Sequence, residues 1–272
     1  MKRRVLAICP LGADRVTIRV IAIVWSGSRS TGLKKIWLAE SEKDQLIRLE
    51  NGRDRNEVAD HLIAEAKRTP QMIIGLDFAF AFPGWFIQQH GCTTAAELLD
   101  LVTRMGEGWL TSCPTPFWGR QGHRRPVDQE HFRHTEHKLP SAGGIRAKSV
   151  FQINGAGAVG CGSLRGMPML HRLRNHGFAI WPFDPPGWPR VVEIYPRVLT
   201  GPVRKSRQEE RTRYLLKNYP QLSGEYRQRA ISSEDAFDAA VSALVMGRRL
   251  PELSSLTQTE DPQLKLEGQI WR

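Results

Sequence analysis

The 272-residue sequence contains little cysteine and no long apolar run. Its four cysteines form no CxxC pair and are widely separated: Cys9, Cys92, Cys113 and Cys161. This spacing indicates reduced thiols rather than a disulfide framework. No stretch of 18 apolar residues is present, so we expect no membrane-spanning helix and no membrane partner. The basic N-terminus imitates a secretory signal, but Asp14 soon interrupts the short apolar run, and we therefore expect a cytoplasmic protein.

Acidic residues are also scarce relative to basic ones. The chain has 28 Asp and Glu against 39 Lys and Arg, a net charge of +11. Residues 118–148 hold seven basic and three acidic residues (+4), and residues 203–230 hold eight and three (+5). Concentrated positive charge suits a phosphate-rich partner, because Lys and Arg displace the counterions of nucleic acid. The charge pattern alone is equally consistent with a basic, solvated surface.

The first part of the chain predicts strands around one helix. The strands are expected at residues 16–25, 34–40, 45–50 and 71–77, the first two as an antiparallel hairpin. Asp54 and Glu57 match a capping box, after which apolar residues recur at helical spacing to residue 67. The fourth strand ends on Asp77 and cannot continue as a central strand past Pro83. This pattern favours an α/β protein.

The remainder predicts an insertion and a second group of elements. Residues 84–148 are rich in Gly, Pro and His, and we interpret them as an irregular basic insertion with a short helix near 94–105. Further strands are expected at 149–154, 178–184 and 191–196, and helices from Pro168 onward, at 205–218 and at 232–247. We expect one domain over residues 20–247, after an N-terminal extension (1–19) and before a C-terminal tail (248–272).

Three carboxylates stand at positions suited to chemistry. Asp77 ends a strand, Glu193 lies within another, and Asp238 lies on the last strong helix. Glu234 and Asp235 precede Asp238 by four and three residues, so all three acids follow one helix edge. Carboxylates so close together favour a cation between them. The alternative is a well-solvated helix N-terminus, where acids are favoured by the helix dipole.

Seven motifs in order then resemble a known family. They are GLDFAFAFP (75–83), CPTPFWG (113–119), FRHTE (132–136), KSVFQINGAGAVGCGSLRGMP (148–168), IWPFDPP (180–186), VEIYPR (192–197) and EDAFDAAVSALV (234–245). This series resembles the domain-of-unknown-function 429 family of predicted ribonuclease H-like nucleases, over residues 20 to 247. The resemblance implies a ribonuclease H-like fold, with a mixed central sheet flanked by helices. It also implies hydrolysis of phosphodiesters with Mg²⁺ or Mn²⁺ held by Asp77, Glu193 and Asp238, and we add the neighbouring Asp235 as a candidate ligand.

The chain departs from that family at the first strand. The segment AIVWSGS (22–28) resembles the family's first strand, which has an aspartate where this chain has Val24. Valine binds no metal, and Asp14 is ten residues earlier, roughly 30 Å away along an extended strand. Two hypotheses therefore stay open: a nuclease impaired by Val24, or a non-catalytic protein that binds nucleic acid.

Two other patterns predict different sites. The segment Gly155–Gly160 matches the G-x-G-x-x-G dinucleotide fingerprint, with Asp184 downstream, so a dinucleotide-binding enzyme is a third hypothesis. Pro168 and the strand expected after Asp184 disfavour it. His131, His134 and His137 raise the possibility of zinc, but on a helix their spacing spreads them around the axis, and no HExxH pattern is present.

Overall fold

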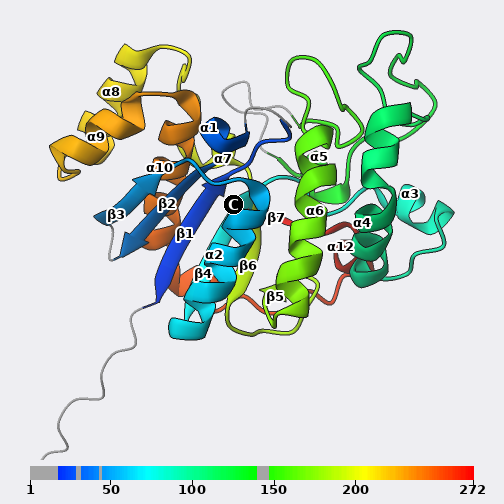
Figure 1. Cartoon of the computed structure of the whole chain (residues 1–272), viewed down its shortest axis with the longest axis horizontal. Coiled ribbons are helices and arrows are strands. Elements are labelled where there is room, and N and C mark those ends of the chain that lie inside the picture. Colours follow the sequence, from blue (N-terminus) through cyan, green and yellow to red (C-terminus); the bar gives the residue numbers. More distant parts are fainter. Residues whose placement is uncertain (1–17, 29–31, 43–44, 140–146) are drawn as a thin grey trace, which may run out of the picture.

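The computed structural model describes residues 18–28, 32–42, 45–139 and 147–272. It shows an α/β protein with a seven-stranded mixed sheet at its centre (Figure 1). The strands are β1 (Arg19–Val24), β2 (Trp37–Glu42), β3 (Gln45–Glu50), β4 (Met72–Asp77), β5 (Ala179–Ile180), β6 (Arg190–Ile194) and β7 (Ile270–Trp271). They lie in the order β3-β2-β1-β4-β6-β5, and β7 also pairs with β6.

The pairing of the strands confirms the expected hairpin. β1 and β3 both pair antiparallel with β2, whereas β4 lies parallel to β1 on its other side. β6 is parallel to β4, and both β5 and β7 are parallel to β6. Residues 16 and 17 of the first predicted strand and the turn residues 29–31 lie outside the described residues. The carboxyl ends of β1, β4 and β6 therefore meet at one edge, which is where parallel sheets place their sites.

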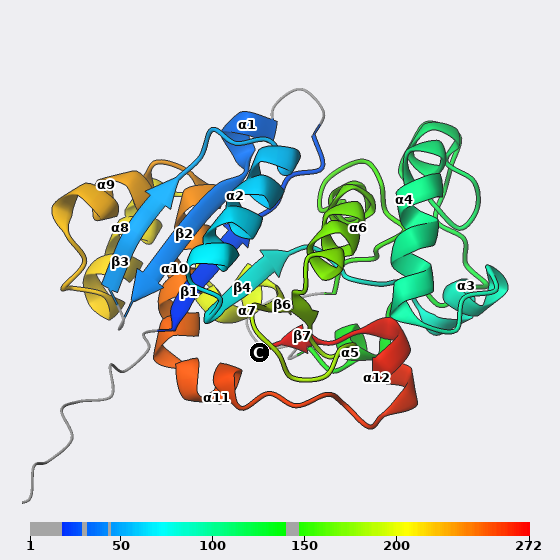
Figure 2. The ribbon, with the colours of Figure 1, turned by 60° about the horizontal axis from the view of Figure 1, so that its bottom comes forward.

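Helices cover both faces of the sheet (Figures 1 and 2). One face packs on α2 (Arg55–Arg68) and α6 (Gly160–Asn175), and α4 (Ala95–Ser112) packs on α6. All three helices share an apolar core with Ile21 and Ile23 of β1. The other face packs chiefly on α10 (Glu234–Arg248), which shares a second core with Val20, Ala22 and Val24. Alternate residues of β1 thus serve opposite cores, as the period of a strand requires. No helix among the described residues is long and apolar enough to cross a membrane.

The insertion is more helical than its composition predicts. Besides α4 it contains α3 (Gly84–Gln89) and α5 (His134–His137). Thr94 and Glu97 form a capping box that starts α4, which runs beyond residue 105 to Ser112. A Cβ at Gly106 would lie 3.2 Å from the Leu164 carbonyl oxygen of α6. Glycine therefore permits the close packing of α4 on α6 rather than ending the helix.

Two predictions around the glycine-rich loop are wrong. Residues 149–154 form turns, with one isolated bridge between Gln152 and Trp118, and join no strand of the sheet. α6 begins at Gly160, so Pro168 lies inside the helix instead of starting it. The Gly160 N–H donates to the Gln152 carbonyl at 2.9 Å, which fastens the turn to the start of the helix. The turn before Gly160 sets the start of the helix, so the preference of proline for a first turn does not decide it.

The last 25 residues are integrated into the domain. They form α11 (Leu250–Ser254), α12 (Pro262–Glu267) and β7, which extends the sheet beside β6. The basic helix expected over 205–218 is α8 (Gln208–Asn218), followed by α9 (Gly224–Ile231). A short α7 (Pro196–Thr200) follows β6.

Candidate functional site

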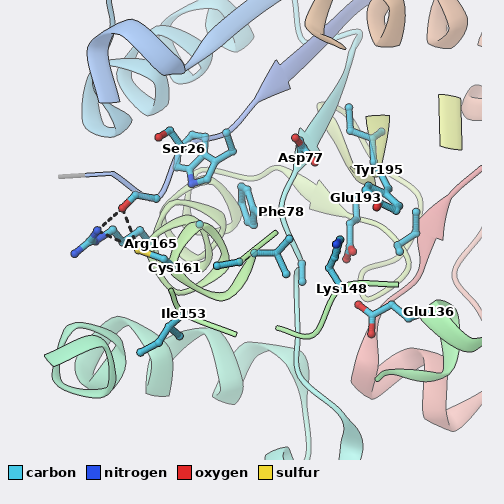
Figure 3. A pocket seen from close by; sticks show the side chains of 18 of the residues that line it. Ser26, Asp77, Phe78, Glu136, Lys148, Ile153, Cys161, Arg165, Glu193 and Tyr195 are labelled. Carbon is cyan, nitrogen blue, oxygen red and sulfur yellow. Dashed lines mark hydrogen bonds between the residues drawn. The ribbon is translucent and has the colours of Figure 1, made fainter. Parts of the chain in front are cut away.

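A pocket of about 620 Å³ opens at the carboxyl ends of β1, β4 and β6 (Figure 3). Residues that follow the three strands line it, together with residues 153–155, residues 158–159 and the first turn of α6. Four basic residues also line it: Lys35, Arg133, Lys148 and Arg165. The pocket is therefore the place where the sheet, the glycine-rich loop and the basic insertion meet.

Asp77 and Val24 are neighbours across this edge. They are register partners in the parallel pair of β4 and β1, so their side chains leave the same face of the sheet. Val24 is 4% exposed and belongs to the apolar core beneath α10. Gly75 lies two residues before Asp77 and so faces the same side of β4. A Cβ at Gly75 would touch the Met246 side chain of α10, so this side of β4 lies under α10. Position 24 therefore adjoins Asp77 but offers it no ligand atom.

Asp238 reaches the same face from α10. Ser233 caps this helix by accepting from the Ala236 N–H, and Asp238 lies one turn inside it, 8% exposed. Its Oδ2 accepts from the Lys205 ammonium at 2.5 Å. Its Oδ1 is buried and has no hydrogen-bond partner within the described ranges. An unpaired buried carboxylate oxygen is costly, so this atom is poised for a further cation or donor.

Of the three aspartates on this face, only Asp238 forms an ion pair among the described residues. Burial, together with the negative charge of Asp238 and against the effect of Lys205, raises the pKa of Asp77 to about 8. Burial also raises the pKa of Asp238 to about 6 against the effect of Lys205. The pKa of Asp235 is raised, chiefly by burial, although Lys35 lowers it. Lys205 lowers the pKa of all three aspartates, but burial still raises each of them. Carboxylates in this state favour the binding of a further cation.

This electrostatic imbalance predicts that Asp77→Asn stabilises the chain. Asp77 titrates at 3.8 when unperturbed and near 8 in the fold, so the folded state retains a proton that the unfolded state has lost. The free energy of unfolding therefore falls as pH rises from about 4 to 8. In a metal chelator, we expect Asp77→Asn to add about 1–3 kcal/mol at pH 8 and almost nothing at pH 4.

Urea unfolding at the two pH values measures this effect. The matched control is Asp100→Asn, because Asp100 is exposed on α4 and pairs only with Arg104 of its own helix among the described residues. An equal gain from Asp77→Asn at both pH values would show that its carboxylate is not the source of the pH dependence.

Glu193 lines the same pocket but is engaged elsewhere. Its Oε1 accepts from Arg133 at 2.5 Å, and its Oε2 accepts from Arg133 and from the Phe80 N–H, each at 2.9 Å. Along β6, Val192 and Ile194 face the α10 core, so Glu193 points to the opposite face. The charges of Asp238, Asp235 and Glu193 all raise the pKa of Asp77, but the Glu193 carboxylate is paired with an arginine. No group of three His, Cys, Asp or Glu positioned for a metal ion occurs within the described part of the chain.

Two residues at the site were not singled out from the sequence. Arg133 is fully buried and binds Glu136 as well as Glu193, while Lys205 contacts Asp238. Both belong to the basic stretches, where one lysine or arginine cannot be distinguished from its neighbours. Arg133 lies in the FRHTE motif, which was the one available signal.

The alternative sites find less support in the fold. The glycine-rich loop does open onto the N-terminus of α6, but residues 147–154, which lead into it, form no strand of the sheet. A dinucleotide fold requires a strand there. Asp184 forms a bidentate pair with Arg174. His131 is buried against the Pro126 carbonyl oxygen, and His137 pairs with Glu130. Comparison of the chain with known protein families, with curated proteins and with solved structures finds no match.

Proposed function

We propose that the chain is a divergent ribonuclease H-like protein of the domain-of-unknown-function 429 type, which binds nucleic acid and hydrolyses phosphodiesters weakly. The observation that supports it best is the in-register pair of Val24 and Asp77 with Asp238 on the same face. Ribonuclease H-like nucleases hold their ions between carboxylates on the first strand, the fourth strand and the last main helix. Here these elements are β1, β4 and α10, and two of the three positions are acidic.

The carboxylates fit one divalent ion, Mg²⁺ or Mn²⁺, better than two. Asp77 and Asp238 would hold it, since both have raised pKa values and Asp238 has a buried oxygen without a partner. A bound ion would stabilise charge that develops on the phosphate. Val24 supplies no ligand to bridge to a second ion, and Glu193 is already neutralised by Arg133. One ion gives less stabilisation of the transition state than two, which accounts for weak hydrolysis.

Nucleic acid is the partner that the charge distribution favours. Each basic stretch contributes to the site, one through Lys148 and Arg133 and the other through Lys205. Lys148 is exposed at the pocket and makes no ion pair within the described residues, so it is available to a phosphate. Figure 1 shows α8 and α9 on one flank of the sheet and the insertion around α4 on the other. A phosphate backbone crossing the pocket would meet both.

The test is binding and cleavage of labelled oligonucleotides. We expect affinity to fall at least about tenfold between roughly 50 and 200 mM salt, because each phosphate contact releases a counterion. Lys148→Gln should reduce the slope of log affinity against log salt by about one. Slow Mg²⁺-dependent cleavage should disappear in Asp77→Asn/Asp238→Asn. Affinity that is insensitive to salt, or cleavage that survives the double substitution, would overturn the proposal.

A further inference from the structure

Lys205 contacts one of the three aspartates on this face of the sheet. Its ammonium contacts Asp238 Oδ2 at 2.5 Å, and its side chain is only 15% exposed. The same charge opposes the raised pKa values of Asp77 and Asp235, so it acts on all three acids. A surface lysine would remain hydrated, whereas this one is drawn in among carboxylates. It occupies one oxygen of a carboxylate that we propose as a metal ligand.

The backbone around Lys205 is held by two arginines. Arg211 is 5% exposed and donates to the Lys205 carbonyl and, from two of its nitrogens, to the Ile231 carbonyl. Arg197 donates to the Val203 carbonyl on the other side of the same segment. These contacts tie the connection between α7 and α8 to α9. They fix the backbone position of Lys205, so its side chain starts close to Asp238.

We propose that Lys205 is a built-in counter-ion of this site, which a divalent ion must displace from Asp238. The inference rests on the proposed function. A divalent ion on the unpaired Oδ1 of Asp238 would lie next to the ammonium that contacts Oδ2 of the same carboxylate, and the two cations would repel each other at that distance. With Lys205 in place the buried carboxylate stays paired without metal. The affinity for metal is correspondingly lowered, and the displaced ammonium becomes available to a substrate phosphate.

The test is the affinity for Mn²⁺ alone, measured by isothermal titration calorimetry. We expect Lys205→Met, which keeps the apolar stem, to bind Mn²⁺ about tenfold more tightly than the natural chain. Without metal its melting temperature should fall by about 5 °C, because Asp238 loses its partner, and Mn²⁺ should restore it. Lys205→Gln keeps an N–H donor for Asp238 and serves if Lys205→Met folds poorly. Lys34→Met is the charge-matched control, since Lys34 is exposed on α1 (Gly32–Lys35) and does not line the pocket.

Each outcome decides the inference. Tighter Mn²⁺ binding by Lys205→Met or Lys205→Gln, but not by Lys34→Met, supports it. Suppose that the natural chain binds Mn²⁺ and that Asp77→Asn abolishes this binding. If both Lys205 variants then bind Mn²⁺ with unchanged affinity, the counter-ion role is overturned and the proposed function stands. Absence of Mn²⁺ binding in the natural chain and in every variant would overturn both.

Discussion

Val24→Asp is expected to raise Mg²⁺-dependent cleavage of oligonucleotides by about 100-fold and to tighten Mg²⁺ binding. The substitution places a carboxylate beside Asp77, on the face that also presents Asp238. A third anionic ligand would allow a second ion and so stabilise both the attacking and the leaving oxygen. Recovery of about 3 kcal/mol of transition-state stabilisation corresponds to this factor of about 100. Rates at saturating Mg²⁺ and calorimetric metal titration measure the two effects.

Val24→Asn is the matched control, because it has the shape of aspartate without its charge. It should change cleavage and metal affinity little, while both variants lose packing in the core beneath α10. Val24→Asp should also depend on metal for stability, since it adds a fourth carboxylate to Asp77, Asp235 and Asp238. Robust cleavage by the natural chain that Asp77→Asn abolishes and Val24→Asp leaves unchanged would show that another residue already supplies the missing ligand.

Arg133→Met is expected to cost about 3–5 kcal/mol of folding free energy, the largest stability effect that we predict. Arg133 is fully buried and donates to Glu136, to Glu193 and to the Glu267 carbonyl oxygen. Its removal leaves two buried carboxylates without their cation, and burial already raises the pKa of Glu136. The same arginine joins the insertion to β6 and to the C-terminal segment, so its loss should loosen three parts of the chain. Urea unfolding and hydrogen exchange in 131–139 and 262–271 measure the effect.

Two further variants serve as controls for Arg133→Met. Arg104→Met removes an exposed arginine that pairs with Asp100 on α4 and should cost less than about 1 kcal/mol. Arg133→Met/Glu136→Gln/Glu193→Gln should recover part of the loss, because no buried charge is then left unpaired. If the triple variant were as unstable as Arg133→Met, the cost would come from lost packing rather than from unpaired carboxylates.

Local sequence patterns predicted the first half of the sheet well. Apolar alternation located β1 to β4, and the pattern of Asp54 and Glu57 marked the start of α2, which the structure shows as a capping box. These features depend on residues close together in the chain, so composition and spacing suffice. The same patterns failed at 149–154 and at Pro168. There, the turn that Gly160 closes with Gln152 sets the start of α6, and the close approach of Gly106 to Leu164 packs α4 on α6.

The sequence by itself determined which carboxylates were available, that position 24 is a valine, and where positive charge concentrates. Only the tertiary structure decided how these charges pair. Glu193 faces Arg133, 60 residues away in sequence, and Asp238 faces Lys205, 33 residues away. The physical reason is that an ion pair depends on distance in space and on burial, which chain spacing does not encode. Alternation along β6 sends Glu193 to one face while α10 brings Asp238 to the other, beside Asp77 and Val24.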